Sequence, residues 1–323
     1  MSRLLRRATT AVVGLALILG TVTAAQAAGS LQSRVDAGSS YAATRGTTIR
    51  IAVLDRVTGE YRDNGAVAHQ HVQSASVMKV FIADNLLRRQ DLGQIRLSAA
   101  DLDALGSMLR SSDDAAANRF WSAYGGNTIV RDVIGRYGLR ETDLTSNVRY
   151  WGNTLVTAHD MVVYYQGLLA GAGGLSAGSR AFIIDQLQRS TPRGTDGYWQ
   201  FFGLRDGLPG EAWIGQKQGW MCCVDGAVFR HSTGFVGPGG RYVFAVLATE
   251  PSARGGAHLE ASVTGAVRAM FPEGSVDLDP QNSSAIGGSG SAYFLDDRFT
   301  GVANRVFRYG EPADEVYVGD WDG

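Results

Sequence analysis

Lysine is nearly absent from this sequence, which holds 30 Lys and Arg residues together but only two lysines, Lys79 and Lys217. Arginine therefore supplies almost every cation. A guanidinium stays protonated in proteins, whereas a buried ammonium can lose its proton and act as a base. The two lysines therefore draw attention as sites where proton chemistry is needed.

Cysteine is just as rare, and the two that occur, Cys222 and Cys223, are neighbours. This excludes a framework of several disulfides. Adjacent Cα atoms lie about 3.8 Å apart across a trans peptide, less than the roughly 4.4–6.8 Å of ordinary disulfides. The residues allow either a strained vicinal bridge or two unpaired thiols, and the spacing favours the thiols.

Long apolar runs are also missing, since no stretch reaches the ~18 residues that predict a membrane-spanning helix. A shorter run over residues 11–22 follows a basic start and precedes the small residues Ala25 and Ala27. This pattern predicts a signal peptide over residues 1–27. No cysteine follows it, so we expect no lipid anchor but a secreted or extracytoplasmic protein of the cell envelope.

An excess of positive charge is absent as well. The formal net charge is -1, and loss of the three arginines in the predicted leader makes it -4. A nucleic-acid-binding protein usually carries a basic surface. We therefore expect no nucleic-acid partner, and nothing in the composition calls for a cofactor or for a state beyond the monomer.

The chain is long enough for one large domain, which we place at residues 28–272. Alternating β-branched residues predict a strand over residues 47–55, and Glu60–Asn64 can return as a hairpin. Further strands are predicted over residues 211–219 and 241–249, and a closing helix over residues 255–270. Residues 99–169 are mostly helical in pattern, with breaks at 125–126 and 147–154. The prediction is an α+β fold: an antiparallel sheet built from both chain ends, plus a helical lobe.

After this domain the composition changes. Residues 273–291 are rich in Ser, Gly and Asn and predict a linker. Residues 292–323 form a short, aromatic and acidic tail that is too small for a core of its own. Its Asp320 and Asp322 have a spacing seen in calcium sites, but one partial repeat offers too few oxygen ligands for calcium.

Ser76 and Lys79 form the first candidate site pattern. A serine at the start of a helix and a lysine three residues later lie one turn apart on the same face. A hydroxyl becomes a good nucleophile when a base takes its proton, and burial beside a second cation lowers the pKa of a lysine enough for that task. The plain alternative is a serine cap followed by a surface lysine.

Two further segments complete the pattern. In Ser112-Asp113-Asp114 a second hydroxyl, Ser112, could relay a proton, although the same residues also suit a helix cap. The segment Lys217-Gln218-Gly219 lies on a predicted edge strand, where Gly219 permits close approach and Lys217 can hold a carboxylate. The next backbone N–H, that of Trp220, is a candidate oxyanion donor together with that of Ser76.

The order of these motifs, SxxK, an SDN-like triplet and a KTG-like triplet, resembles the serine β-lactamase and penicillin-binding-protein superfamily, most closely its class A members. The resemblance covers roughly residues 40–270. It implies a nucleophile at Ser76, proton transfer by Lys79 and Ser112, and electrostatic help from Lys217. It also implies substrate contacts from Asp114, Gln218, Gly219 and Trp220. The tail resembles the start of an FG-GAP or VCBS-type repeat.

The sequence departs from the family pattern in several places. Asp114 replaces an amide and Gln218 replaces a threonine, so the first becomes a pure acceptor when ionised. The family's deacylating glutamate usually stands in an ExxLN pattern, and Glu141 begins only a partial match. Either Glu141 fills that role, or the loop over residues 145–155 is short and has no glutamate; the position of Gly138 favours the second reading.

Other residues carry weaker signals. His69 and His71 have the spacing of a metal pair on a strand, but no third ligand is evident, and we expect no metal there. His159 and Asp160 look like the start of a helix rather than a catalytic dyad. Arg230 or His231 could reach a substrate carboxylate. The aromatic residues that could line a groove or pack in the core are Tyr198, Trp199, Phe201 and Phe202.

The predicted function is an exported serine hydrolase that forms an acyl-serine intermediate with β-lactams or cell-wall peptides and deacylates slowly. The alternative is a catalytically impaired relative that binds peptidoglycan or serves as a surface adhesion protein.

Overall fold

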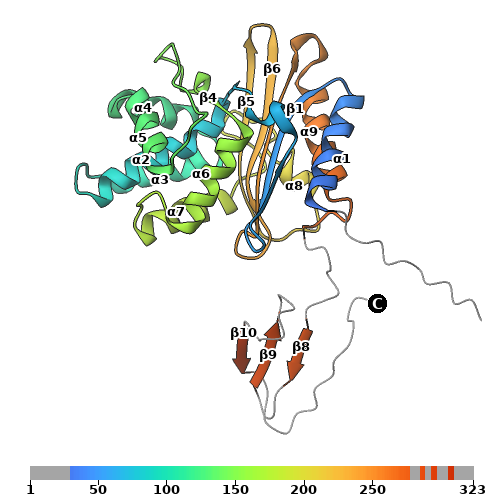
Figure 1. Ribbon diagram of the computed structural model, residues 1–323. Coiled ribbons are helices and arrows are strands. Elements are labelled where there is room, and N and C mark those ends of the chain that lie inside the picture. The colour runs from blue at the N-terminus through green and yellow to red at the C-terminus, as the bar shows by residue number, and fades with distance from the viewer. Residues whose placement is uncertain (1–29, 277–283, 288–291, 297–304, 309–323) are drawn as a thin grey trace, which may run out of the picture.

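The computed structural model describes residues 30–276, 284–287, 292–296 and 305–308. The predicted signal peptide lies outside these residues, and so do Asp320 and Asp322 of the tail. Residues 30–276 fold into a sheet with helices on both faces (Figure 1). No helix within the described residues is long and apolar enough to cross a membrane.

The central sheet has five antiparallel strands in the order β2-β1-β7-β6-β5. Their bounds are β1 Thr48–Asp55, β2 Glu60–Asp63, β5 Ile214–Val224, β6 Ala227–Val236 and β7 Tyr242–Pro251. The strands come from the two ends of the domain, as the sequence predicts, and β5 is an edge strand. A separate pair, β3 Val72–Gln73 and β4 Leu155–Val156, links the segment before Ser76 to the segment before helix α6 Ala158–Ala170.

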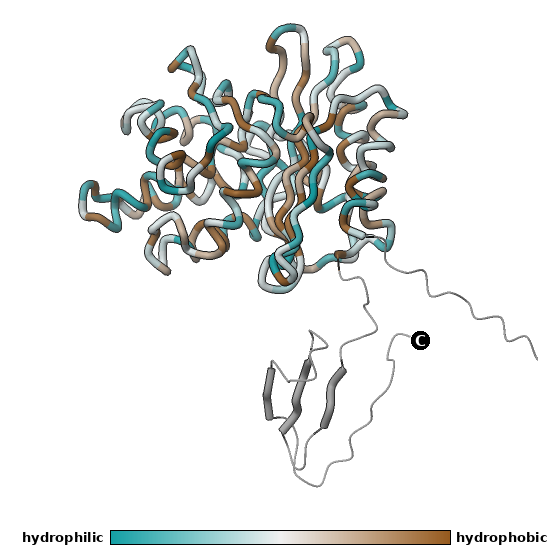
Figure 2. Tube along the Cα trace, in the orientation of Figure 1, coloured by the Kyte–Doolittle hydropathy of each residue, from teal (hydrophilic) through white to brown (hydrophobic). Residues whose placement is uncertain are grey.

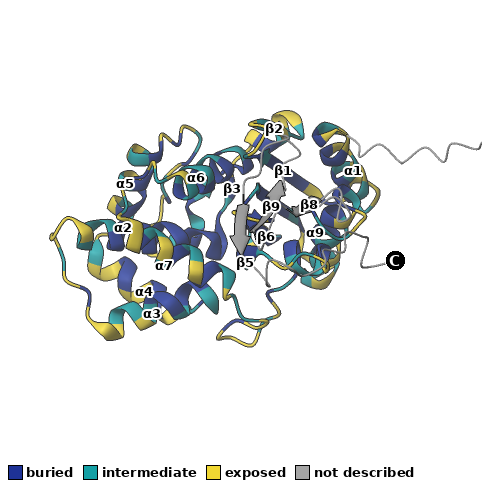
Figure 3. Cartoon of the chain, turned by 90° about the horizontal axis from the view of Figure 1, so that it is seen from below, coloured by how far each residue is buried: buried dark blue, intermediate teal, exposed yellow. Residues whose placement is uncertain are grey.

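Alternation along the strands divides the apolar side chains between two cores, because successive side chains of a strand point to opposite faces. On β7, Phe244 and Val246 enter the core under α1 Leu31–Thr44 and α9 Gly256–Met270, whereas Val243 and Ala245 enter the core under the helical lobe. Figure 2 shows the apolar strands in the middle of the molecule. Figure 3 shows that exposed residues lie mainly on the outer surfaces of the helices.

The helical lobe follows Ser76 and ends where the chain returns to the sheet. Its helices are α2 Lys79–Asp91, α3 Ala99–Arg110, α4 Asp114–Tyr124, α5 Asn127–Tyr137, α6 Ala158–Ala170 and α7 Ala177–Gln188. A short α8 Leu204–Gly207 precedes β5. The breaks predicted at residues 125–126 and 147–154 both separate helices, and Gly125 takes a left-handed conformation at the end of α4.

The α+β prediction is confirmed, with local differences. The helix expected from Ser76 begins instead with a 3₁₀ turn, Ala75–Met78, and only then continues as α2. The strand predicted to end at residue 219 runs on to Val224. Helix α1 was not predicted, because its sequence has few apolar residues and a weak helical pattern; α9 covers its buried side.

The predicted linker is partly structured. Val276 is 1% exposed and packs into the core beneath α9, and the N–H of Gly210 donates to the carbonyl of Gly274. The compact unit therefore extends past residue 272. Strand β8 Ser284–Gly287 lies inside the predicted linker and pairs with β9 Ala292–Asp296, which pairs with β10 Arg305–Arg308.

Candidate active site

Ser76 lies in the 3₁₀ turn Ala75–Met78, between strand β3 and helix α2. The preceding residue, Ala75, has a φ of 46°, a region that residues with a Cβ seldom occupy. Such conformations persist where the surroundings hold them, and they cluster at functional sites. The turn is packed tightly against β5, since a Cβ at Gly219 would lie 3.0 Å from the carbonyl oxygen of Ser74.

Lys79 is the first residue of α2 and is fully buried. Its Nζ lies 2.9 Å from the Oγ of Ser76 and 2.8 Å from the Oγ of Ser112, and it donates to the Ser112 carbonyl at 2.6 Å. Both hydroxyls therefore contact the same ammonium. A base in this position is within reach of the serine proton.

Ser112 lies between helices α3 and α4 and is the second strained residue of the site, with a φ of 55°. This conformation places its Oγ between the two lysines, 3.0 Å from the Nζ of Lys217. Lys217 is buried on β5 and also donates to the carbonyl of Gln218 at 3.0 Å. The structure thus brings together all four residues predicted to be catalytic.

The burial of the two lysines changes their proton affinity. Desolvation lowers the pKa of Lys79, against the opposing effect of the Asp114 carboxylate. The pKa of Lys217 lies well below its usual value, because the side chain is desolvated and the Lys79 ammonium is close. Two neighbouring buried ammonium groups disfavour each other's charge. The pair therefore binds its second proton less readily than two isolated lysines would.

Asp114 makes a direct ion pair within the site. Its Oδ1 lies 2.5 Å from the Nζ of Lys79, while its side chain is 67% exposed. The carboxylate therefore favours the charged form of Lys79. The motif predicts a substrate contact for Asp114, and in the structure Asp114 also raises the proton affinity of Lys79.

A cavity of about 220 Å³ opens in front of Ser76. Its lining residues are Ala75, Ser76, Asp114, Asn118, Arg149, Tyr150, Trp151, Gly152, Asn153, Trp220 and Met221. The ring of Trp151 lies 4.9 Å from the Nζ of Lys79, and that of Trp220 lies 5.8 Å from the Nζ of Lys217. The cavity lining is thus partly aromatic, and the two buried lysines lie behind it, close to these rings.

The three residues that follow Lys217 differ in their access to this cavity. Trp220 lines it, and its indole donates to Asp196 at 3.0 Å. Gln218 is 1% exposed and its amide nitrogen donates to Ser232 at 2.8 Å, away from the cavity lining. The close approach that Gly219 permits is to the turn of Ser76. In this structure Gln218 and Gly219 therefore support the position of the site residues and do not line the cavity.

The other polar and aromatic candidates have structural partners. Arg230 forms an ion pair with Glu260 at 3.2 Å and stacks on Tyr198, which itself stacks on Trp220. His231 is fully buried, and burial lowers its pKa to about 4. Trp199 is partly exposed and meets Phe201 edge to face, whereas Phe202 is buried in the core.

Glu141 lies outside the cavity lining. Its Oε1 is 2.8 Å from the Nδ1 of His69, and its Oε2 accepts from the hydroxyl of Thr157 at 2.8 Å. The cavity-lining part of the loop over residues 145–155 contains no glutamate or aspartate. This arrangement favours the second alternative, in which the loop is short and carries no deacylating glutamate.

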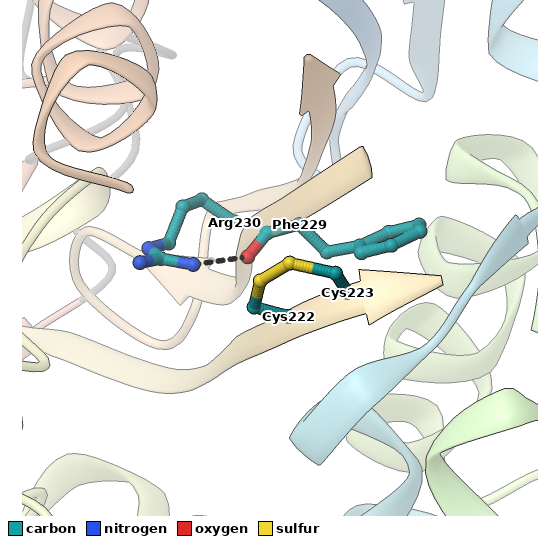
Figure 4. The surroundings of a disulfide bond; sticks show 4 residues. All are labelled: Cys222, Cys223, Phe229 and Arg230. Carbon is teal, nitrogen blue, oxygen red and sulfur yellow. Dashed lines mark hydrogen bonds between the residues drawn. A yellow bond between two sulfur atoms is a disulfide. The ribbon is translucent and has the colours of Figure 1, made fainter. Parts of the chain in front are cut away.

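The two cysteines are bonded to each other, whereas the sequence favoured two unpaired thiols. Cys222 and Cys223 form a vicinal disulfide with a cis peptide bond, and their Cα atoms are 3.0 Å apart. The expectation of two unpaired thiols is therefore wrong, because it assumed the longer Cα separation of a trans peptide. Figure 4 shows the bridge at the exposed end of β5, beside Phe229 and Arg230 of the neighbouring strand.

Sequence reasoning missed the aromatic and amide groups at the entrance. The indole of Trp151 donates to the Oδ1 of Asn118 at 2.8 Å, and that of Trp121 donates to the Val148 carbonyl at 2.7 Å. These bonds fix the loop over residues 145–153 to α4. The available signal was three aromatic or cationic residues in a row, Arg149-Tyr150-Trp151, within an otherwise polar break.

The chain matches known proteins over most of this domain. Residues 101–269 match the model of the β-lactamase enzyme family Beta-lactamase2. A protein of Mycobacterium tuberculosis strain H37Rv and one of Mycobacterium bovis, both named "Putative lipoprotein LppW", are 46% identical to it over 248 residues, 77% of either chain.

Solved structures with the same fold include a β-lactamase from Chitinophaga pinensis, at 18% identity and a TM-score of 0.61, covering 75% of this chain and 99% of that one. A class A β-lactamase from Mycobacterium abscessus has 20% identity and a TM-score of 0.59, covering 74% and 98%. The family match, the shared fold and the converging serine and lysine side chains lead to one assignment. The chain belongs to the β-lactamase enzyme family and has the fold of the serine β-lactamases.

Proposed function

We propose that the protein is an extracytoplasmic serine hydrolase that forms an acyl-enzyme on Ser76 with β-lactams or cell-wall peptides and releases the product slowly. The observation that carries this proposal is the contact of one buried ammonium, that of Lys79, with both hydroxyls, Ser76 and Ser112. The fold and family support a serine hydrolase of the β-lactamase type.

Acylation begins with a proton transfer. Neutral Lys79 takes the proton of Ser76 while the serine Oγ attacks the carbonyl carbon of the substrate. The N–H groups of Ser76 and Trp220 stabilise the oxyanion. The leaving nitrogen then receives a proton through Ser112, whose Oγ lies within 3.0 Å of both lysines. An anionic group of the substrate beside Lys217 would favour the protonated form of that lysine and be held by it.

Slow deacylation follows from the shortage of a second base. Release of the acyl group needs a water activated near the ester carbonyl. Asp114 is the only carboxylate that lines the cavity within the described residues, and its Oδ1 is already paired with Lys79. Glu141 is held by His69 and Thr157. An acyl-enzyme on Ser76 is therefore expected to persist.

The ion pair of Asp114 also supports a second candidate, an impaired relative that binds peptidoglycan or serves in surface adhesion. A carboxylate on the lysine favours the protonated amine, which is not a base. The two candidates differ in one property, the ability of Ser76 to form a covalent bond with a substrate.

The expected location is outside the cytoplasm, at the cell envelope. The leader-like start of the sequence supports export, and the lipoprotein name of the relatives supports an envelope protein. We propose that the protein acts there as a secreted monomer.

The test is intact mass spectrometry of the protein after incubation with a penicillin, followed by removal of free penicillin. The proposal expects a mass increase of one penicillin that decays slowly and is absent from the Ser76→Ala variant. A protein that never forms the adduct supports the binding-only alternative. Fast loss of the adduct with continued hydrolysis contradicts the slow-release part.

A further inference from the structure

A second cluster of ionisable side chains lies outside the serine site. His69, Glu141 and His159 each contribute one donor atom, and these atoms all lie within 4.8 Å of one another. The three residues come from the short 3₁₀ helix Gly65–His69, from the segment after α5, and from the first turn of α6. They are 72 and 18 residues apart in the chain, so the fold assembles the cluster.

The distances between the donor atoms suit a single ion. The Nδ1 of His69 lies 2.8 Å from Oε1 of Glu141, and the Nδ1 of His159 lies 3.6 Å from Oε2. Zinc–nitrogen bonds of about 2.0–2.1 Å place neighbouring ligand atoms about 3.3 Å apart in a tetrahedron. The two observed separations lie on either side of that value.

His159 carries the most direct sign of a missing partner. Its Nδ1 is buried and has no hydrogen bond within the part of the chain that the structure describes. The same nitrogen faces two carboxylates, Glu141 and Asp160, the second at 3.4 Å. A buried nitrogen without a partner is costly. A cation held between the imidazole and the carboxylates would satisfy all three groups.

Hydrogen bonds orient the ligands as they do around protein-bound metals. With His69 Nδ1 turned to the cluster, its Nε2–H donates to Oδ2 of Asp63 at 3.1 Å. Histidine ligands commonly donate their second nitrogen to a carboxylate in this way, and ligating carboxylates are themselves hydrogen-bonded. Glu141 meets the second condition, since Thr157 donates to its Oε2 and Asp160 accepts from its backbone N–H at 2.8 Å.

The local charge also calls for a cation. Three carboxylates gather here, those of Asp63, Glu141 and Asp160, and all three act on the hydroxyl of Tyr61. None of them has a Lys or Arg partner in the ion pairs of the described residues. A divalent cation supplies the positive charge that these groups otherwise lack.

We propose that His69, Glu141 and His159 form a binding site for a divalent transition metal, with Zn²⁺ as the preferred ion. Two imidazoles and one carboxylate are ligands typical of zinc, whereas magnesium and calcium prefer oxygen ligands alone. The Oδ1 of Asp160 lies 3.4 Å from the Nδ1 of His159, but Asp160 is not one of the three residues whose donor atoms all lie within 4.8 Å of one another. His71 is not a ligand, because its Nε2 is engaged with the backbone carbonyl of Glu141 at 2.7 Å.

The site has a structural consequence for the serine centre. His69 precedes β3 and His159 follows β4, and these strands pair with each other. Strand β3 leads directly into the turn of Ser76, where the Ser74 N–H donates to the Thr154 carbonyl at 2.8 Å. A metal bound to both His69 and His159 therefore links the two strands beyond their last paired residues. It stabilises the segment that leads to Ser76 and does not contact the substrate.

The test is isothermal titration of Zn²⁺ into metal-free protein that carries no polyhistidine tag, with the bound zinc counted after dialysis. One ion per chain is expected. His159→Phe keeps an aromatic ring against Tyr61 and His69 but removes the nitrogen, and it breaks no hydrogen bond of the described residues. It should weaken Zn²⁺ binding by at least roughly 100-fold, more than the loss of outer partners usually costs.

A matched control is His258→Gln, which removes the other histidine that faces a carboxylate, Glu250, at 2.9 Å without a third ligand. This variant should bind Zn²⁺ as the wild type does. The Ser76→Ala variant should also bind normally, which separates this site from the acylation chemistry. The proposal is overturned if Zn²⁺ does not bind, if His159→Phe binds it unchanged, or if His258→Gln loses it equally.

Discussion

At the scale of single residues, Asp114 opposes the effect of burial on the pKa of Lys79. Burial pushes Lys79 toward the neutral amine that a base requires, while the Asp114 carboxylate at 2.5 Å pushes it toward the ammonium. The net effect is a lowered pKa of Lys79, so desolvation outweighs the ion pair with Asp114. The acidic neighbour therefore limits the pH range in which Ser76 can be activated.

Asp114→Asn should extend acylation to lower pH. The carboxylate raises the pKa of Lys79, so its removal lowers that pKa and leaves more neutral lysine under acidic conditions. The measurement is the rate of adduct formation on Ser76 as a function of pH. Asp113→Asn keeps the helix cap and removes a weaker influence, so its shift should be smaller. An unchanged acidic limit in Asp114→Asn contradicts this account of Lys79.

Ser112→Ala should slow acylation by about 10²-fold or more, as the loss of a proton-transfer group typically does. Its hydroxyl is the atom that contacts both lysines. Ser111→Ala is the neighbouring control, because the Ser111 hydroxyl bonds to Thr191. Equal rates for the two variants would remove Ser112 from the mechanism.

At the scale of elements, the site depends on contacts between the turn of Ser76, strand β5 and the pair β3–β4. His231 on β6 joins the β3–β4 pair to the central sheet: its Nε2 donates to the Gln73 carbonyl on β3 at 2.8 Å, and its Nδ1 accepts from the N–H of Ala248 on β7. Both nitrogens are used, so the ring is neutral in the folded protein, in agreement with its pKa of about 4.

His231 should make the protein less stable as the pH falls from about 6.5 to about 4. The unfolded chain takes up a proton near pH 6.5, whereas the folded chain resists until about pH 4 because of desolvation. The stability is fully present above pH 6.5, and the loss amounts to roughly 3 kcal/mol at most. Chemical unfolding of wild type and His231→Gln across this range measures it; parallel pH curves would contradict the prediction.

Glu141→Gln should leave the lifetime of a penicillin adduct unchanged within a few-fold. The residue is bonded to His69 and Thr157 and does not line the cavity. Its loss should instead lower the thermal stability, because the outer end of the β3–β4 pair loses these bonds. The adduct decay and the unfolding temperature are measured on the same variant. A much longer adduct lifetime would identify Glu141 as the deacylating base.

Local patterns in the sequence identified the strands, the helical lobe and the four central residues. Ser76 and Lys79 are one turn apart, so their contact follows from spacing, and the rarity of lysine pointed to Lys217. The entrance was not predictable in this way, because Trp151 and Asn118 meet only after the chain has folded. The proposed metal site is a similar case: the sequence showed no third ligand beside the HxH pair His69 and His71, because Glu141 and His159 come from distant segments.

At the scale of the whole molecule, two cores flank one sheet, and the serine site lies where the helical lobe meets β5. Both cores are formed by residues between Leu31 and Val276. Among the residues whose burial the structure describes, the last one in either core is Val276.

A chain cut after Val276 should keep the thermal stability and the acylation of the longer protein. A chain cut after residue 272 should be less stable, because it loses the buried side chain of Val276 and the bond between Gly210 and Gly274. Thermal unfolding of the two shortened chains compares them directly. Equal unfolding temperatures would contradict the boundary drawn at Val276.

The central claim concerns a covalent bond between Ser76 and a substrate, and the most direct measurement is the intact mass of the protein with a penicillin. The account predicts that wild type gains the mass of one penicillin, that peptide mapping places it on Ser76, and that Ser76→Ala gains none. A wild-type protein without the adduct, or a Ser76→Ala variant that is labelled at the same rate, would contradict it.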